Sequence, residues 1–290
     1  MKNFLLLLAT ATLAMFVGCT SVSEDEECLL EVPLPYGYMP EPKNNEIYYT
    51  TTDDKMLCID DLIWGNVTLV SHTYENGVGC LTFDGMLNEI CPYAFGCSKL
   101  SGIKMSNCIT SIGEHAFEWC DIHTIIIPDG VHSIGKSAFA GCKLLWNIHL
   151  PEGIMKIEGC TFEDCTLLES INIPSNVISI GDCAFYNCWH LTSITIPRNV
   201  TYIGMGAFEQ CENLATIYCQ PTTPPSIYFC DYSLSSVLRE NSFPLNFGMN
   251  IYVPQESHDA YMQYSSHANG NTSPKNWYKY EKYIKPYDYE

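Results

Sequence analysis

The sequence predicts a β-rich repeat solenoid with a cap at each end, and three observations lead to this prediction. A phenylalanine closes each of six copies of one pattern, and successive copies lie 22 or 23 residues apart: Phe95, Phe117, Phe139, Phe162, Phe185 and Phe208. Isoleucines alternate with other residues at the start of each copy. In most copies a proline follows directly. A fixed period in this length range is typical of stacked structural repeats.

Each copy is expected to begin with a short β-strand. Two apolar columns mark it, Ile103, Ile125, Ile148, Ile171, Ile194 and Ile217 in the first, and Met105, Ile127, Leu150, Ile173 and Ile196 in the second. This alternation predicts a strand with one buried face. The prolines that follow cannot donate to a further ladder bond and therefore end the strand; they are Pro128, Pro151, Pro174 and Pro197.

The remainder of each copy fills the inside of the coil. Further apolar columns lead to a turn glycine, a small residue and the closing phenylalanine, as in residues 200–208 (VTYIGMGAF). One unit of this length cannot bury its own apolar face, whereas stacked units bury a continuous core. With strands about 4.8 Å apart, six or seven coils predict a slab on the order of 30 Å long.

The extended pattern L-x-x-I-x-I-P-x-x-V-x-x-I-G-x-x-A-F-x-x-C, seen complete in residues 191–211, resembles the BspA-like class of bacterial leucine-rich repeats. The resemblance covers about residues 81–220. It implies a leucine-rich-repeat solenoid of about 23 residues per coil. It also implies a surface protein that adheres to host or matrix proteins or interacts with other microbes. Met105-Ser106, the short spacing from Phe95 to Cys97 and residues 154–162 depart from the pattern.

The first residues have the features of an exported lipoprotein. Residues 1–18 hold one lysine and an apolar run from Phe4 to Val17, which is right for a signal-peptide core and too short for a membrane span. The segment Phe16-Val17-Gly18-Cys19 resembles a bacterial lipobox, which implies an acylated Cys19 at the mature N-terminus. An ordinary secretory signal is the alternative.

Residues 19–46 are predicted to form an acidic, proline-rich linker behind the lipid anchor. Four acids at positions 24–27 look like the export signal of some surface lipoproteins, so we expect surface exposure at the outer membrane; a periplasm-facing anchor is the alternative. The formal net charge is −19, and no basic stripe occurs. Nucleic acid and anionic lipid headgroups are therefore disfavoured as binding partners. The N-terminal lipid anchor is the only contact with the membrane that the sequence predicts.

The repeat region, residues 81–220, is expected to lie between two caps. Strands are predicted in the N-terminal cap (residues 47–80) at residues 47–52 and 67–70. A third strand is expected at residues 81–83, with Leu81 and Phe83 in the strand columns of a first coil. The period fails after Ile217, and residues 221–290 are predicted to form an irregular last coil with a strand at residues 250–254. Short helices are expected at residues 255–264 and 277–284.

No catalytic set is apparent in the chain. Residues 130–137 match G-x-x-x-x-G-K-S, but Pro128 ends the preceding strand and no long helix can follow, so the match is interpreted as a coincidence of the repeat. Neither H-E-x-x-H nor G-x-S-x-G occurs. The sequence therefore predicts no enzyme, no metal and no cofactor.

Cysteines also follow the repeat. Six of them were assigned to one column, Cys97, Cys120, Cys142, Cys165, Cys188 and Cys211, and Cys160 and Cys183 form a second. Buried thiols that pack as small apolar groups are the favoured interpretation. Disulfides and a zinc site remain alternatives, although parallel side chains in neighbouring coils rarely meet disulfide geometry.

The variable positions beside the isoleucines are the predicted binding surface. Trp146, His149, Glu169 and Asn172 are the candidate binding residues, because they are expected on the exposed sheet face and tryptophan is common at recognition sites. The predicted function is a non-catalytic, lipid-anchored adhesin that binds an extracellular protein. A glycan-binding accessory lipoprotein, with Trp119, Trp146 and Trp189 as aromatic platforms, and a purely structural envelope protein are the alternatives.

Overall fold

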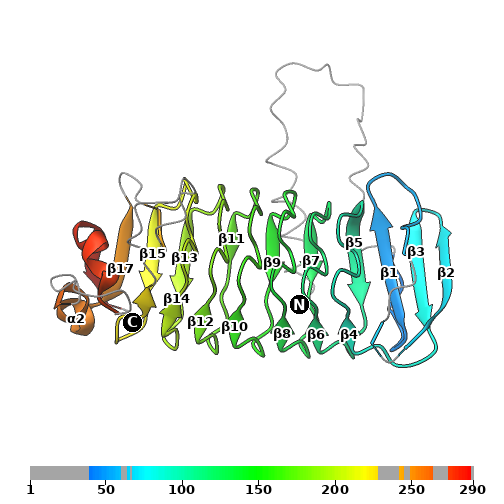
Figure 1. The fold of residues 1–290 in the computed structure, drawn as a ribbon, viewed down its shortest axis with the longest axis horizontal. Helices are drawn as coiled ribbons and strands as arrows, with labels where there is room; N and C mark the ends of the chain where they lie inside the picture. Colours follow the sequence, from blue (N-terminus) through cyan, green and yellow to red (C-terminus); the bar gives the residue numbers. More distant parts are fainter. Residues whose placement is uncertain are drawn as a thin grey trace, which may run out of the picture. The chain divides into compact units, whose positions relative to one another are not determined.

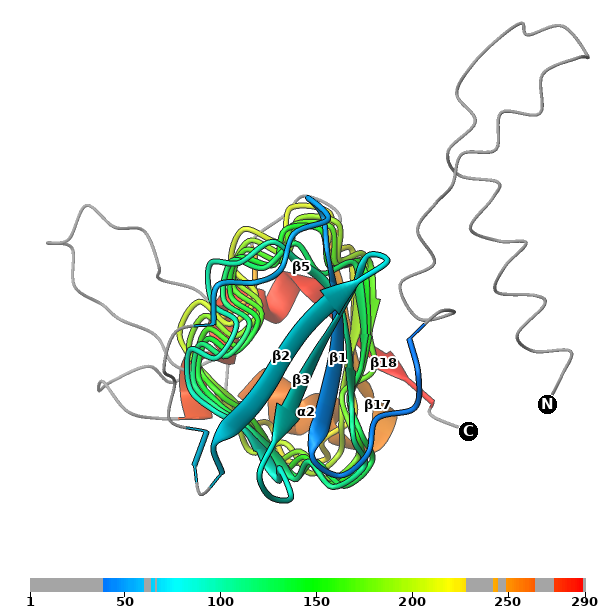
Figure 2. The same ribbon diagram turned by 90° about the vertical axis from the view of Figure 1, so that its right-hand side faces the viewer.

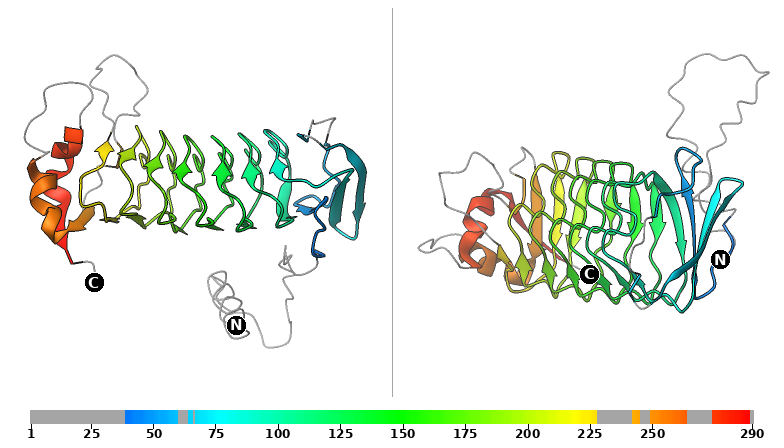
Figure 3. Two further views of the ribbon diagram at one scale, coloured as in Figure 1. Left: turned by 90° about the horizontal axis from the view of Figure 1, so that it is seen from below. Right: turned by 45° about the vertical axis from the view of Figure 1, so that its right-hand side comes forward.

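The structure is a computed structural model that describes residues 39–59, 64–65, 67–227, 242–244, 249–263 and 274–288. All of these belong to one compact unit, Pro35–Glu290. The coils of this unit stack in a row, with the N-terminal strands at one end and the short helices at the other (Figures 1 and 3). The predicted repeat solenoid is confirmed.

Each coil contributes one strand to each of two ladders. The first ladder holds β5 (Leu100–Met105), β7 (Thr124–Ile126), β9 (Asn147–His149), β11 (Ser170–Ile171), β13 (Ser193–Ile196) and β15 (Thr216–Cys219). The second holds β4 (Glu89–Ile90), β6 (Ser111–Ile112), β8 (Ser133–Ile134), β10 (Lys156–Ile157), β12 (Ser179–Ile180), β14 (Tyr202–Ile203) and β16 (Ser226–Ile227). Where neighbouring coil strands pair, they pair in parallel with isoleucine opposite isoleucine, as Ile148 with Ile171 and Ile180 with Ile203. Viewed along the stack, the coils superpose (Figure 2).

The prolines do more than end strands. The carbonyl oxygen of Pro128 accepts a hydrogen bond from the backbone N–H of Val131 at 3.0 Å, and Pro174 and Val177 repeat this at 3.1 Å. Each proline therefore opens a tight turn that carries the chain from the first ladder toward the second.

The closing phenylalanines form one continuous stack through the core. Neighbouring rings are nearly parallel, with centroids 5.2–5.7 Å apart, from Phe95 to Phe208 and on to Phe243. Trp64 packs edge-on against Phe95 at one end, and Tyr280 packs edge-on against Phe243 at the other. Stacked aromatic rings of this kind dominate core energetics because each buries a large apolar area.

Each turn around a phenylalanine uses two left-handed residues. From Tyr93 to Gln210, positions two before and two after the ring have φ between 54° and 71°, and most are not glycine: Tyr93, Cys97, His115, Trp119, Ser137, Gly141, Cys160, Asp164, Cys183, Asn187, Gly206 and Gln210. This backbone is unfavourable for residues with a Cβ. Hydrogen bonds between coils offset the cost, since the N–H of Trp119, for example, donates to the carbonyl oxygen of Ala140 at 2.7 Å.

The N-terminal cap is an antiparallel sheet in the order β2-β3-β1-β5. Strand β1 (Glu46–Thr51) confirms the first predicted strand, whereas β2 (Leu69–Glu75) begins later and ends later than predicted. Leu81 and Phe83 lie in β3 (Val78–Phe83), which is antiparallel to β1, so the prediction that they begin the first coil is wrong. The physical reason is that β1 pairs with β5 and occupies the place beside the first coil.

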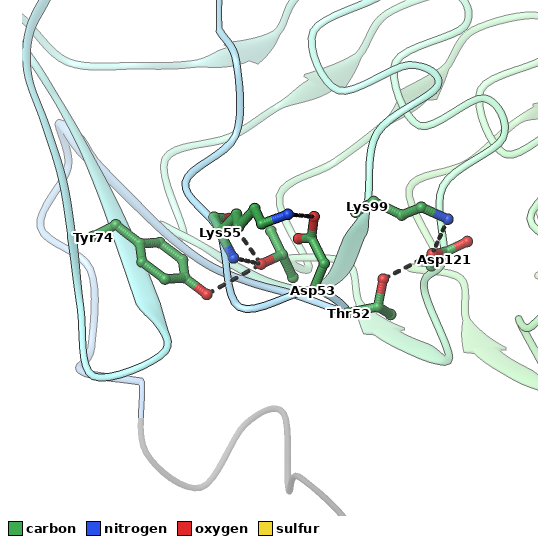
Figure 4. A network of polar contacts seen from close by, with 7 residues as sticks. Thr52, Asp53, Lys55, Tyr74, Lys99 and Asp121 are labelled. Atoms are coloured by element: carbon green, nitrogen blue, oxygen red, sulfur yellow. Dashed lines mark hydrogen bonds and ion pairs between the residues drawn. The ribbon is translucent and has the colours of Figure 1, made fainter.

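A polar network ties this cap to the first coils. The Thr52 hydroxyl and the Lys99 ammonium both contact one oxygen of Asp121, at 2.9 Å and 3.0 Å (Figure 4). Beside them the Thr51 hydroxyl meets the Tyr74 hydroxyl at 3.1 Å. The loop after β1 is therefore fixed both to its own sheet and to the repeats.

The C-terminal end continues the repeat further than the sequence indicates. Strand β16 joins the second ladder and Phe243 extends the ring stack. The sequence period does end, as predicted, because Phe243 follows Phe208 by 35 residues, but the coil geometry continues. Strand β17 (Asn250–Pro254) pairs in parallel with β15, as predicted for the last coil. A 3-10 turn (Gln255–Ser257) and α2 (His258–Gln263) confirm the first short helix.

The second predicted helix needs a correction. A 3-10 helix covers Pro274–Tyr283, and Ile284 begins the strand β18 (Ile284–Tyr287), which pairs in parallel with β17. Ile284 is buried, whereas the three residues that follow are exposed. A free ladder edge on β17 therefore determines the conformation of this segment.

Candidate functional site

The exposed side of the first ladder, called the strand face below, is the candidate binding surface. Its central row contains the residue that follows the first buried isoleucine of each coil: Ile126, His149, Asn172, Thr195, Tyr218 and Tyr252. Side chains alternate along a strand, so these project away from the core. Stacking in register places them side by side, one per coil.

The four predicted binding residues lie in two neighbouring coils, on or next to strands β9 and β11. Glu169 follows Trp146 in the next coil, and its N–H donates to the Trp146 carbonyl oxygen at 3.2 Å. The β9–β11 register, Ile148 opposite Ile171, likewise places His149 beside Asn172. His149, Glu169 and Asn172 are exposed and Trp146 is half-buried. Trp146 thus neighbours Glu169, and His149 neighbours Asn172, in adjacent coils; these four residues are called the Trp146–Asn172 patch below.

A tyrosine cluster, Tyr218, Tyr252 and Tyr287, ends the same face. Tyr218 and Tyr252 stack with centroids 5.4 Å apart and planes 18° from parallel. Tyr287 meets both rings edge-on, at 5.7 Å and 5.6 Å, and stays 43% exposed. Lys285 lies beside Tyr252 in the β17–β18 register. The cluster offers apolar ring surface, three hydroxyl groups and a nearby cation on fixed strands.

The sequence predictions missed this cluster. Tyr218 and Tyr252 each follow a column isoleucine in the dipeptide Ile-Tyr, a signal that would have placed both in the central row. Tyr287 lies on β18, for which the repeat gives no signal.

The other tryptophans differ in their surroundings. Trp119 is 45% exposed, but its indole covers Gly141, where a built Cβ would lie 2.5 Å from the ring. The Lys143 ammonium is 5.0 Å from the centroid of the same ring. Trp189 is 50% exposed on the turn after Cys188. Trp119 is therefore largely engaged within the stack, and neither residue belongs to the strand face.

The first cysteine column is a hydrogen-bonded ladder. Each thiol donates to the carbonyl oxygen of the previous coil's phenylalanine at 3.0–3.2 Å; the donors are Cys120, Cys142, Cys165, Cys188 and Cys211. Burial raises the pKa of Cys120 to about 12, so its thiol remains a donor at neutral pH. Cys97 does not belong to this column: Ser98 takes the place three residues after the phenylalanine, whereas Cys97 lies two residues after Phe95, at the exposed left-handed position that Trp119 takes in the next coil.

Three further predictions concern positions outside the strand face. Cys19 lies outside the described residues. Residues 130–137 run through β8 into the turn before Phe139, where a built Cβ on Gly135 would lie 2.5 Å from the Glu114 nitrogen, so this glycine serves coil packing. Within the described ranges, no group of three or more metal-ligating side chains occurs.

A family model described as "BspA type Leucine rich repeat region" matches six copies, over residues 74–145 and 132–243. Together these ranges cover more than half of the chain. A search of curated proteins finds no match.

Three solved structures are similar to this chain at low sequence identity. A Treponema pallidum leucine-rich repeat protein is 24% identical, with 58% of this chain and 69% of that chain covered and a TM-score of 0.36. A leucine-rich repeat protein from Bacteroides ovatus is 23% identical, with coverage of 67% and 65% and a TM-score of 0.37. A leucine-rich cell surface protein from Faecalibacterium prausnitzii is 22% identical, with 60% of each chain covered and a TM-score of 0.31.

The chain therefore spans less than two-thirds of the length of the latter two proteins. In the described part of the chain, no helix is long and apolar enough to cross a membrane.

Proposed function

The chain belongs to the BspA type leucine-rich repeat family, and from this premise we propose that it is a non-catalytic cell-surface protein whose strand face binds an extracellular protein. Stacked repeats provide an extended, rigid surface with variable side chains, which is the usual binding platform of solenoids. The partner belongs to a host, its matrix or another microbe.

The observation that carries this proposal is the row from the Trp146–Asn172 patch to the tyrosine cluster. Tyrosine and tryptophan dominate protein–protein hot spots because a large ring is buried on binding at little cost in conformational entropy. The rings of Tyr218 and Tyr252 already restrain each other. Less order is therefore lost when a partner covers them.

The stacking geometry favours a protein over a glycan as the ligand. A sugar ring stacks on a free aromatic face, whereas Tyr218 and Tyr252 cover one face of each other. Ring edges, hydroxyl groups and the polar side chains of Thr195 and Asn172 remain for contacts along the row. Such a surface fits an irregular protein epitope better than a flat pyranose.

Lipid anchoring through Cys19, after removal of residues 1–18, would hold this face outside the cell. The lipobox-like segment and the acidic run behind it support this location. The F. prausnitzii relative is described as a cell surface protein. Metabolic labelling with a clickable fatty acid tests the anchor, because Cys19→Ala should lose the label while Cys28→Ala should keep it.

Binding is tested with an array of matrix proteins, mucins, bacterial surface proteins and polysaccharides probed with purified residues 20–290. The proposal expects a protein hit that Tyr252→Ala and Trp146→Ala each weaken about tenfold or more, the effect of a strong hot spot. Trp189→Ala is the control, since it removes an exposed aromatic ring from another surface. Circular dichroism should show unchanged folding in all three variants.

The other outcomes discriminate the alternatives. A polysaccharide hit alone, accompanied by quenching of tryptophan fluorescence, would favour a glycan-binding accessory protein. A protein hit unaffected by both strand-face variants would place the binding site elsewhere. No hit with any class would favour a structural envelope protein.

A further inference from the structure

The second cysteine column differs from the buried ladder. Cys160 and Cys183 occupy equivalent positions in neighbouring coils, two residues before Phe162 and Phe185. Their φ angles, 55° and 54°, are nearly identical, so their Cα–Cβ bonds point the same way. The N–H of Cys160 donates to the Asp182 carbonyl oxygen at 2.8 Å, which fixes the two coils against each other beside Cys183.

The spacing of these coils matches that of a disulfide. Strands β10 and β12 of these two coils pair in parallel, which sets the coils about 4.8 Å apart, and a disulfide joins Cα atoms about 4.4–6.8 Å apart. Cys183 contributes to the raised pKa of the Cys160 thiol, so the two side chains lie within interaction distance of each other. Closing the bond therefore requires side-chain rotation within two ordered turns, with no movement of the coils past each other.

This pair differs from the ladder cysteines in its exposure to solvent. Cys160 is partly exposed, whereas Cys183 is buried. Cys142, Cys165, Cys188 and Cys211 are fully buried, and each already donates to a carbonyl oxygen. An oxidant in solution reaches Cys160 and reaches none of those four.

We propose that Cys160 and Cys183 are a redox-active dithiol that closes to a disulfide and staples two coils together. The Cys160 thiolate attacks one sulfur of a protein or small-molecule disulfide and releases one thiol of that oxidant. The Cys183 thiolate then displaces the second thiol. The two cysteines lose two protons and two electrons, and the oxidant's disulfide is reduced to two thiols.

The neighbouring carboxylate controls the rate of this exchange. The Cys183 side chain, burial and the Glu163 carboxylate hold the pKa of Cys160 above its ordinary value. Since the thiolate is the attacking species, closure accelerates as pH rises. Glu163→Gln removes the negative charge and should speed closure several-fold at neutral pH.

The proposal is tested by incubating the purified protein with oxidised glutathione and mapping its peptides by mass spectrometry without reduction. The expected result is a Cys160–Cys183 cross-link that lacks two hydrogen atoms and is lost on treatment with dithiothreitol. The oxidised protein should also unfold at a higher temperature. A lasting glutathione adduct on Cys160, or free thiols at both positions, would overturn the proposal.

Two variants separate the staple from general oxidation. Cys160→Ala should fold, because the side chain is partly exposed, and should lose the oxidant-induced rise in unfolding temperature. Cys97→Ala removes another exposed cysteine in a left-handed turn and should keep the full rise. If Cys160→Ala retained the rise, the stabilisation would come from a different cysteine pair and the assignment would be wrong.

Discussion

The ring of Tyr49 lies over Gly79, its directly opposite partner in the antiparallel β1–β3 register. A Cβ built on Gly79 would lie 2.0 Å from Cζ of the tyrosine ring, so the ring occupies the space that any other residue would fill. The Tyr49 hydroxyl also accepts a hydrogen bond from the N–H of Leu57 at 3.1 Å and pairs with Nε2 of His72. One glycine thus permits the contact that joins β1, β2 and the following loop.

Gly79→Ala should destabilise the N-terminal cap. The new methyl group overlaps a fully buried ring that cannot move without breaking its hydrogen bonds, and overpacking of this kind costs about 1–3 kcal/mol. Urea unfolding measures the loss. Gly130→Ala is the control: a Cβ there meets only ordinary contacts at 3.4 Å and 3.5 Å, so its effect should stay within about 1 kcal/mol. Equal losses in the two variants would contradict the role of the ring.

Stability should fall in mild acid because of His72. Burial lowers the pKa of this imidazole below its ordinary value of 6.5, so the folded state favours the neutral ring. The unfolded chain binds the proton at higher pH than the folded chain does. The contribution is therefore complete above about pH 6.5 and is lost as pH falls toward the lowered pKa.

The pH effect is measured by urea unfolding between pH 7.5 and pH 5. His72→Gln keeps a hydrogen-bonding partner for Tyr49 but does not titrate, so its stability should decline less than that of the parent over this range. The rest of the chain is common to both proteins, so its contribution cancels in the difference. Identical pH profiles would rule out His72 as the source.

Phe243→Ala should cost as much stability as Phe162→Ala. Both rings are fully buried, and both stack on a neighbouring phenylalanine, at 5.3 Å for Phe208–Phe243 and 5.3 Å for Phe162–Phe185. Removing a buried phenylalanine side chain costs about 3–5 kcal/mol. Chemical denaturation compares the two variants. A loss below about 1 kcal/mol for Phe243→Ala would mean that the ring stack ends at Phe208.

Gln210→Gly should stabilise the protein. Gln210 is exposed and has φ of 60°, a conformation that glycine adopts without the steric cost borne by other residues, so a gain of up to about 1 kcal/mol is expected. Arg198→Gly is the control, because it is equally exposed and has no left-handed backbone; it should lower stability. Thermal unfolding distinguishes the two directions. A loss in Gln210→Gly would show that its side chain contributes more than the strain.

The periodic part of the fold could be predicted from the sequence because the same positions are buried in every repeat. Ile148 and Ile171 were predicted as buried partners, and they are. Cys97 was misassigned because it lies two residues after its phenylalanine instead of three, at a left-handed position whose side chain is exposed. The left-handed turns, for example at Trp119 and Asp164, could not be predicted from the sequence. Only two of the twelve left-handed positions around the phenylalanines are glycine, the residue that usually indicates this conformation.

The candidate site was only partly predictable. The alternation of strand residues placed His149 and Asn172 on the exposed face, and the register then brought Trp146 and Glu169 beside them. The tyrosine cluster includes Tyr287, which lies on β18. That strand forms because its residues, from Ile284 onward, pair with the outer edge of β17. Pairing partners at a sheet edge depend on geometry that no local pattern records.

By itself, the sequence determined the coil: its length, its buried columns, its proline turns and its family, because each of these is a short-range property repeated in every copy. Only the tertiary structure decided how the stack ends. It placed β1 between β3 and β5, carried the ring stack on to Phe243, and gathered Tyr218, Tyr252 and Tyr287 into one cluster. Ends are set by contacts between segments far apart in the chain, and the repeat period contains no information about them.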